Sequence, residues 1–168
     1  MSHNLFESTT DFLGVFDGIS EEDAAGWKRA AGFRDACLPA INEHWQKSEY
    51  PLDLVAKLGE LDVMTDGLDI PGHATMSTLG AGLTLMEVTR IDASMGTVVA
   101  VQAGLAMRSI DMLGSEEQKQ KYLPDMANCT LLGSFGLTEP NHGSDSIALE
   151  TSAVRDGDDW VLNGEKKW

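Results

Sequence analysis

Apolar residues recur at helical spacing from Ser20 onward, which predicts a series of helices in the first third of the chain. Ser20 can cap the first helix, and the acidic residues 21–23 suit its first turn, where the helix dipole favours negative charge. Pro39 is predicted to interrupt this helix, with a shorter helix following through Trp45. Pro51 then marks the first position of another helix. Its inward face is predicted to carry Leu54, Val55 and Leu58.

The next region is predicted to hold two long helices, at about residues 76–92 and 95–113, that are apolar on nearly every face. Helices of this kind pack inside a bundle rather than on its surface. Residues 115–118 (Ser-Glu-Glu-Gln) have the sequence of a capping box and begin a further helix. Pro124 is predicted to limit that helix to about two turns.

After residue 128 the pattern changes from helices to short strands and turns. Strands are predicted at residues 131–138, 151–155, 160–162 and 165–168, with Asn163-Gly164 as a hairpin turn before the last one. The fold class is therefore α+β. Residues 1–130 are predicted to form an N-terminal helical domain with a loosely structured lead-in at 1–19. Residues 131–168 are predicted to begin an antiparallel β domain.

Charge and the N-terminal sequence exclude several classes of function. The 168 residues include 27 acidic and 12 basic side chains, a net charge of −15, which disfavours partners such as nucleic acids and anionic membranes. No Lys or Arg precedes Lys28, so the start resembles neither a secretory signal nor a mitochondrial presequence. No apolar stretch is long enough to cross a bilayer. A cytoplasmic location is therefore expected.

The two cysteines and four histidines show no metal-binding spacing, so no metal site is predicted.

The most unusual segment of the sequence is residues 135–145, where a strand end turns at Glu-Pro and enters a Gly-Ser-Asp element. Free amides and small hydroxyls in such a segment suit a planar cofactor with a polar rim. The alternative is an ordinary turn that caps itself through Asn, Asp and Ser side chains.

Three motifs in order identify a resemblance. They are Leu137-Thr138-Glu139-Pro140-x-x-Gly143-Ser144-Asp145, then Asn163-Gly164-x-Lys166-x-Trp168, and, upstream, the run of residues 114–124. Together they resemble the acyl-CoA dehydrogenase family of flavoenzymes, most clearly from residue 51 to residue 168. The run of residues 136–141 is most similar to glutaryl-CoA dehydrogenases and short-chain acyl-CoA oxidases.

The resemblance implies an FAD cofactor and an acyl-CoA substrate that is oxidised to a 2-enoyl-CoA. It assigns the flavin contacts to Phe135, Leu137, Thr138, Gly143, Ser144 and Trp168. It assigns the substrate contacts to Ser144, Met95 and Val99. It further implies electron-transferring flavoprotein as the electron acceptor and a dimeric or tetrameric homo-oligomer of the complete protein.

Two departures from the family pattern refine this expectation. Glutaryl-type members carry an Arg and a Ser where this sequence has Gly96 and Ala100, so a plain acyl-CoA of short to medium chain length is expected instead of a dicarboxylic one. The family's catalytic base lies in a C-terminal helical domain. No catalytic residue is therefore assigned here: Glu139 is expected to serve the turn, and Glu87 and Glu165 to be surface or helix-supporting carboxylates. The chain is expected to be the N-terminal part of a protein roughly twice as long.

Other readings remain open at this stage. The residues could form a non-catalytic helical interaction module on a degenerate flavoenzyme scaffold, or belong to an acyl-CoA oxidase that passes electrons to oxygen. His142, inside the motif, is expected to be a solvent-facing loop residue without an acid–base role.

Overall fold

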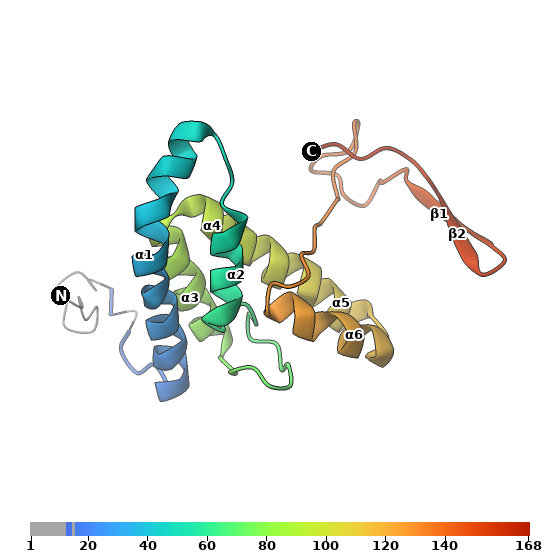
Figure 1. Cartoon of the computed structure of the whole chain (residues 1–168). Helices are drawn as coiled ribbons and strands as arrows, with labels where there is room; N and C mark the ends of the chain where they lie inside the picture. The colour runs from blue at the N-terminus through green and yellow to red at the C-terminus, as the bar shows by residue number, and fades with distance from the viewer. Residues whose placement is uncertain (1–12, 15) are drawn as a thin grey trace. The chain divides into compact units, whose positions relative to one another are not determined.

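The computed structural model describes residues 13, 14 and 16–168, so most of the predicted lead-in at 1–19 lies outside the described residues. A helical unit ends at Gly133, and a second unit comprises Ser134–Trp168. The helices are α1 (Glu21–Lys47), α2 (Leu52–Glu60), α3 (Thr78–Ile91), α4 (Ala93–Val99), the π-helix η2 (Ala100–Met107), α5 (Arg108–Leu113) and α6 (Glu116–Ala127), and the strands are β1 (Ser152–Asp156) and β2 (Asp159–Asn163) (Figure 1). The α+β fold class is confirmed.

Two buried apolar clusters hold the helical unit together, because its amphipathic helices have no other way to remove their apolar faces from water. The first cluster joins α1, α2, α3 and α4 and includes Phe33, Cys37, Leu58, Met64, Val88, Met95 and Val99. The second joins the loop after α2 with η2 and α6 and includes Leu68, Ile70, Met107, Leu123 and Met126. No helix in the described part of the chain is both apolar enough and long enough to cross a bilayer.

The helix starts agree with the predicted caps. The Ser20 hydroxyl accepts a 3.0 Å hydrogen bond from the Asp23 amide, and the Ser115–Gln118 capping box forms in both directions. The helix that begins after Pro51 buries Leu54, Val55 and Leu58 as expected, although Pro51 itself is the N-cap. The second long apolar helix is continuous from Ala93 to Leu113, with the π-helix in its middle.

The predictions for Pro39 and Pro124 are wrong, because both prolines lie inside helices that continue past them. Each proline removes one main-chain hydrogen bond, to the carbonyl four residues earlier. Those carbonyls belong to the exposed residues Asp35 and Gln120, where water can replace the lost donor. Buried side chains continue on both sides of each proline, so packing extends the helix.

The strand pattern is only partly confirmed. The hairpin β1–β2 is antiparallel and pairs Ser152 with Asn163 and Asp156 with Asp159. Residues 132–138 have no regular secondary structure, so the first predicted strand is wrong, as is the strand at 165–168. Neither segment pairs with another strand, because the sheet found in the described residues consists of β1 and β2 alone.

A buried carboxylate joins the start of α1 to the start of α3. Asp23 is 4% exposed and accepts hydrogen bonds from the Ser77 amide at 2.8 Å and from the Ser77 hydroxyl at 2.7 Å. Hydrogen bonding from the Ser77 side chain is the main reason why the pKa of Asp23 is lowered. Gly80 leaves room for this carboxylate, since a Cβ there would lie 2.1 Å from its Oδ1.

We expect Asp23→Ala to lower the free energy of unfolding by about 2–3 kcal/mol, because two charge-assisted hydrogen bonds are lost. Denaturant unfolding at neutral pH measures this loss. Because the folded pKa is lowered, the Asp23 contribution is present above the ordinary carboxyl pKa and disappears as the pH falls through the lowered value. The exposed Asp35→Ala on the same helix is the control and should change stability by less than about 0.5 kcal/mol. Equal losses in both variants would contradict the role of Asp23.

Candidate functional site

Residues 134–138 have no regular secondary structure, and most of them are exposed. Phe135 is 45% exposed and Leu137 is 39% exposed, while Thr138 is half-buried. In the described part of the chain, no group accepts a hydrogen bond from the main-chain N–H groups of residues 134–138. A Cβ at Gly136 would meet open space. The segment therefore presents both an apolar surface and unsatisfied donors to whatever lies beside it.

Glu139, directly after this segment, is the centre of the second unit. Its side chain is almost fully buried, and Oε2 accepts a 2.7 Å hydrogen bond from the Glu150 amide. Its Oε1 accepts hydrogen bonds of 3.0 Å from the Thr151 amide and from Lys166 Nζ. The Glu139 carboxylate thus connects its own turn with the segment that precedes β1 and with the segment that follows β2.

This hydrogen bonding lowers the pKa of Glu139 to about 2, with the donor groups of Thr151 contributing most, then the Glu150 amide, and Lys166 also contributing. A carboxylate held this firmly in its ionised form is a poor proton acceptor at neutral pH. The structure therefore agrees with the prediction that Glu139 serves the turn, while the expectation that it is not the catalytic base stays a prediction.

The segment after β2 runs back to the exposed segment. Lys166 Nζ donates to the Leu137 carbonyl at 3.0 Å, and the Lys167 amide donates to the Thr138 carbonyl at 2.8 Å. The predicted hairpin turn at Asn163-Gly164 is wrong for this reason: the chain passes Thr151 instead of reversing. Gly164 is required there, because its φ is +152° and a Cβ would lie 2.3 Å from Thr151 Oγ1.

The C-terminal Trp168 is fully exposed, one residue beyond the contact with the Thr138 carbonyl. Its ring is therefore available for stacking, as are the apolar side chains of Phe135 and Leu137. Gly143 and Ser144 are exposed as well, and nothing lies within 4 Å of a Cβ built at Gly143. All six residues that the sequence assigned to the cofactor thus lie within the second unit and have exposed or half-buried surfaces.

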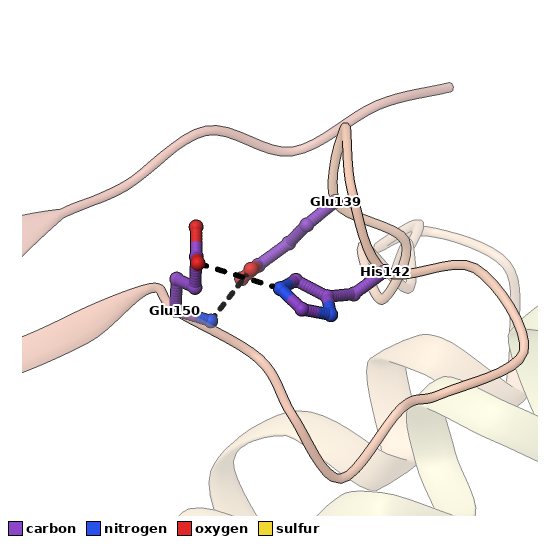
Figure 2. Close-up of side chains that lie close together, drawn as sticks. All are labelled: Glu139, His142 and Glu150. Atoms are coloured by element: carbon purple, nitrogen blue, oxygen red, sulfur yellow. Dashed lines mark hydrogen bonds and ion pairs between the residues drawn. The ribbon is translucent and has the colours of Figure 1, made fainter.

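His142 closes the tight turn that follows Glu139. Two main-chain hydrogen bonds of 3.1 Å link His142 and Glu139. The His142 ring is only 19% exposed, and its Nε2 lies 3.5 Å from Glu150 Oε1 (Figure 2). The expectation of a solvent-facing histidine is therefore wrong, because the turn directs the ring toward the segment before β1.

Potential ligand atoms of Glu139, His142 and Glu150 lie within 4.8 Å of one another (Figure 2). The sequence spacing predicted no metal site, and these residues come together only through the turn. Both oxygens of Glu139 already accept hydrogen bonds, and the Lys166 ammonium compensates the carboxylate charge. A cation would have to displace Lys166, so we attribute the cluster to the structure of the turn.

The comparison with protein families assigns both units. Residues 20–130 match the family model "Acyl-CoA dehydrogenase, N-terminal domain", and residues 134–168 match "Acyl-CoA dehydrogenase, middle domain". The chain belongs to the acyl-CoA dehydrogenase family. Its motifs therefore lie in the context that the sequence resemblance predicted, and the recognition of this family is confirmed.

Individual members show the same relationship. The chain is 40% identical to the probable acyl-CoA dehydrogenase YngJ of Bacillus subtilis over 126 residues, which is 73% of this chain and 33% of the relative. It is 37% identical to the mitochondrial short-chain specific acyl-CoA dehydrogenase of Rattus norvegicus over 122 residues, 71% of this chain and 29% of the relative. The chain therefore spans about a third of the length of these curated relatives.

A crystal structure of a glutaryl-CoA dehydrogenase from Mycobacterium smegmatis, in complex with FADH2, superimposes with a TM-score of 0.82. The two sequences are 36% identical, and the match covers 98% of this chain and 41% of that chain. Both units of this chain are therefore represented in a solved structure of the family.

The two predicted substrate residues Met95 and Val99 lie on α4 in the helical unit. Met95 and Val99 are almost completely buried in the first apolar cluster, and that they contact an acyl group stays a prediction. Their neighbour Val98 lines a hollow of about 260 Å³ between α2, α4, η2 and the chain after α6.

Glu87 on α3 is fully buried, and both of its carboxylate oxygens accept hydrogen bonds from Arg90 on the same helix, which agrees with a helix-supporting role.

Sequence reasoning missed the roles of Lys166 and Gln102. Lys166 belongs to the second motif, but its partners lie 27 and 29 residues earlier, a distance at which local patterns give no contact information. Gln102 had one visible signal, since it is a polar residue within the longest apolar stretch. It is buried and binds the main chain where the helical unit ends.

We expect Glu139→Gln to release the segment before β1, because the amide group places a donor against the Glu150 amide or against Lys166. Hydrogen exchange should become at least about tenfold faster at the amides of Glu150 and Thr151 and at Lys167. Glu165→Gln is the matched control, since it removes the same charge from an exposed side chain of the same unit. Unchanged exchange in Glu139→Gln would disprove the proposed role of this carboxylate.

Proposed function

We propose that the protein to which this chain belongs catalyses the FAD-dependent α,β-dehydrogenation of an acyl-CoA thioester to a 2-enoyl-CoA. The observation that supports this most directly is the segment Ser134–Thr138, whose exposed apolar side chains and free amides suit a flat, polar-rimmed ring. An FADH2 complex of a family member with the same fold over 98% of this chain supports the same reading.

The residues present fit a flavin. Phe135, Leu137 and Trp168 offer apolar and aromatic surface to the ring, and the main-chain N–H groups of residues 135–138 offer donors to its edge. The Thr138 hydroxyl has no partner among the described residues and is a further donor. Gly143 and Ser144 are exposed for contact with the cofactor, and Ser144 also for contact with the acyl chain. When bound, FAD accepts the hydride from the β-carbon of the substrate.

The chain's own residues bind and orient; they do not remove the α-proton. Glu139 is held ionised by Thr151, Glu150 and Lys166, and Glu87 is buried against Arg90. Following the family resemblance, we assign the catalytic carboxylate to the part of the protein outside residues 1–168. Exclusion of water from the thioester and stabilisation of its enolate likewise need groups from that part.

We propose a plain acyl-CoA of short to medium chain length as the substrate. Gly96 leaves no room for the cationic side chain that a dicarboxylic substrate needs, since a Cβ there would lie 2.2 Å from Thr89 Oγ1 and 3.0 Å from Thr89 Cα. Ala100 offers no hydroxyl group. A distal carboxylate would enter an apolar site without a partner, which is unfavourable.

Electron-transferring flavoprotein as the acceptor, a dimeric or tetrameric assembly and a cytoplasmic location stay predictions from the sequence. We further propose a role in fatty acid metabolism. Oxygen as the acceptor is the alternative within the same family of enzymes. Hydrogen peroxide formation during turnover distinguishes the two acceptors.

The full-length protein, expressed with both units intact, is expected to purify with bound flavin and to lose its flavin absorbance when butyryl-CoA is added without oxygen. The value of kcat/KM for butyryl- or hexanoyl-CoA should exceed that for glutaryl-CoA at least about a hundredfold, because the distal carboxylate is unpaired. Spectrophotometry with an artificial electron acceptor measures both substrates. Absence of flavin would contradict the enzymatic proposal, and equal turnover of glutaryl-CoA would contradict the substrate proposal alone.

A further inference from the structure

Gln102 is a buried amide that binds the main chain at the end of the helical unit. It lies in the π-helix η2 and is 2% exposed. Its Nε2 donates to the Met126 carbonyl at 2.9 Å and to the Leu131 carbonyl at 2.8 Å, and its Oε1 accepts a 2.7 Å hydrogen bond from the Gly133 amide. Both donor hydrogens are used, and the three contacts join residues 24 to 31 positions apart in sequence.

The chain from Leu131 to Gly133 is also confined by packing. A Cβ at Gly133 would lie 2.8 Å from the Ala106 Cβ and 2.6 Å from Met126 Cε. Ala106 lies in η2 and cannot move aside as a flexible side chain could. Gly133 therefore allows the main chain to lie directly against the π-helix, within reach of the Gln102 amide.

The turn that follows α6 also contacts α2. A Cβ at Gly59 would lie 2.2 Å from the Asn128 carbonyl oxygen, so α2 and the turn after α6 are in direct contact. Cys129 adopts a left-handed φ of 56°, and the Cys129 and Thr130 amides bind carbonyls in the last turn of α6. Main-chain hydrogen bonds thus constrain the chain at residues 128–131, and the Gln102 amide constrains it again at Gly133.

A buried amide is costly unless all of its hydrogen bonds are made, and a leucine would fill a similar volume. The advantage of glutamine here is directional. Its planar amide donates to the Met126 and Leu131 carbonyls and accepts from the Gly133 amide, so it favours the path that residues 131–133 follow here. Phe135, the first residue assigned to the cofactor, follows two positions later.

We propose that Gln102 is a positioning residue for the flavin segment, acting through Gly133. It fixes the main chain of residues 131–133 and so anchors the point from which residues 134–138 start. This inference rests on the proposed function, since the segment matters in this way only when it holds a flavin.

Hydrogen exchange in the full-length protein tests this anchor directly. In the unmodified protein, the Gly133 amide should exchange as slowly as the amides of η2, because it is bound by Gln102. Gln102→Leu keeps the volume but removes all three hydrogen bonds, and exchange at the Gly133 amide should become at least about tenfold faster. The Kd for FAD should rise about tenfold or more, while the KM for the acyl-CoA changes less than kcat.

Val88→Ala is the matched control, since it weakens the buried core on α3 and leaves the contacts of residues 131–133 intact. It should lower the Tm without selectively raising exchange at Gly133 or weakening FAD binding. A Gln102→Leu variant that behaves like Val88→Ala would overturn the proposal, as would rapid exchange of Gly133 in the unmodified protein. If the unmodified protein binds no FAD, the proposed function fails, and the exchange comparison still decides whether Gln102 anchors the chain.

Discussion

The buried carboxylate of Glu139 is the interaction on which the second unit depends. It accepts hydrogen bonds from Glu150, Thr151 and Lys166, and so joins three segments that are not neighbours in sequence. A two-stranded hairpin has little stability of its own in water. An ionised group with several donors supplies the missing cohesion at one point. The exposed side chains of residues 135 and 137, close to it in sequence, are among those to which we assign flavin binding.

The helical unit also uses buried polar side chains that bind main-chain groups. Its helices are held by apolar burial, which is strong but has no direction. Polar groups are buried where direction matters: Asp23 at the start of two helices, Asp92 at the junction of α3 and α4, and Gln102 where the chain leaves the unit. Each makes hydrogen bonds with main-chain groups, so each fixes a path of the backbone.

The fold was predictable from the sequence where local chemistry decides. Periodicity and the caps at Ser20 and Ser115 located the helices, and the strands predicted at 151–155 and 160–162 correspond to β1 and β2. Pro39 and Pro124 were misjudged, because burial of the face opposite each proline outweighs one lost hydrogen bond. The motif residues were found by resemblance, but the contacts of Lys166 were not, since they depend on which distant segments meet.

Titration of the Glu139 carboxyl group by NMR tests most directly whether this side chain organises the second unit. The hydrogen bonds from Thr151, Glu150 and Lys166 predict a pKa of about 2, well below the ordinary value of 4.5. The chemical shifts of the Glu150 and Thr151 amides should follow the same transition, because both bind this carboxylate. A carboxyl group that titrates near 4.5, without a response at these amides, would contradict the assignment.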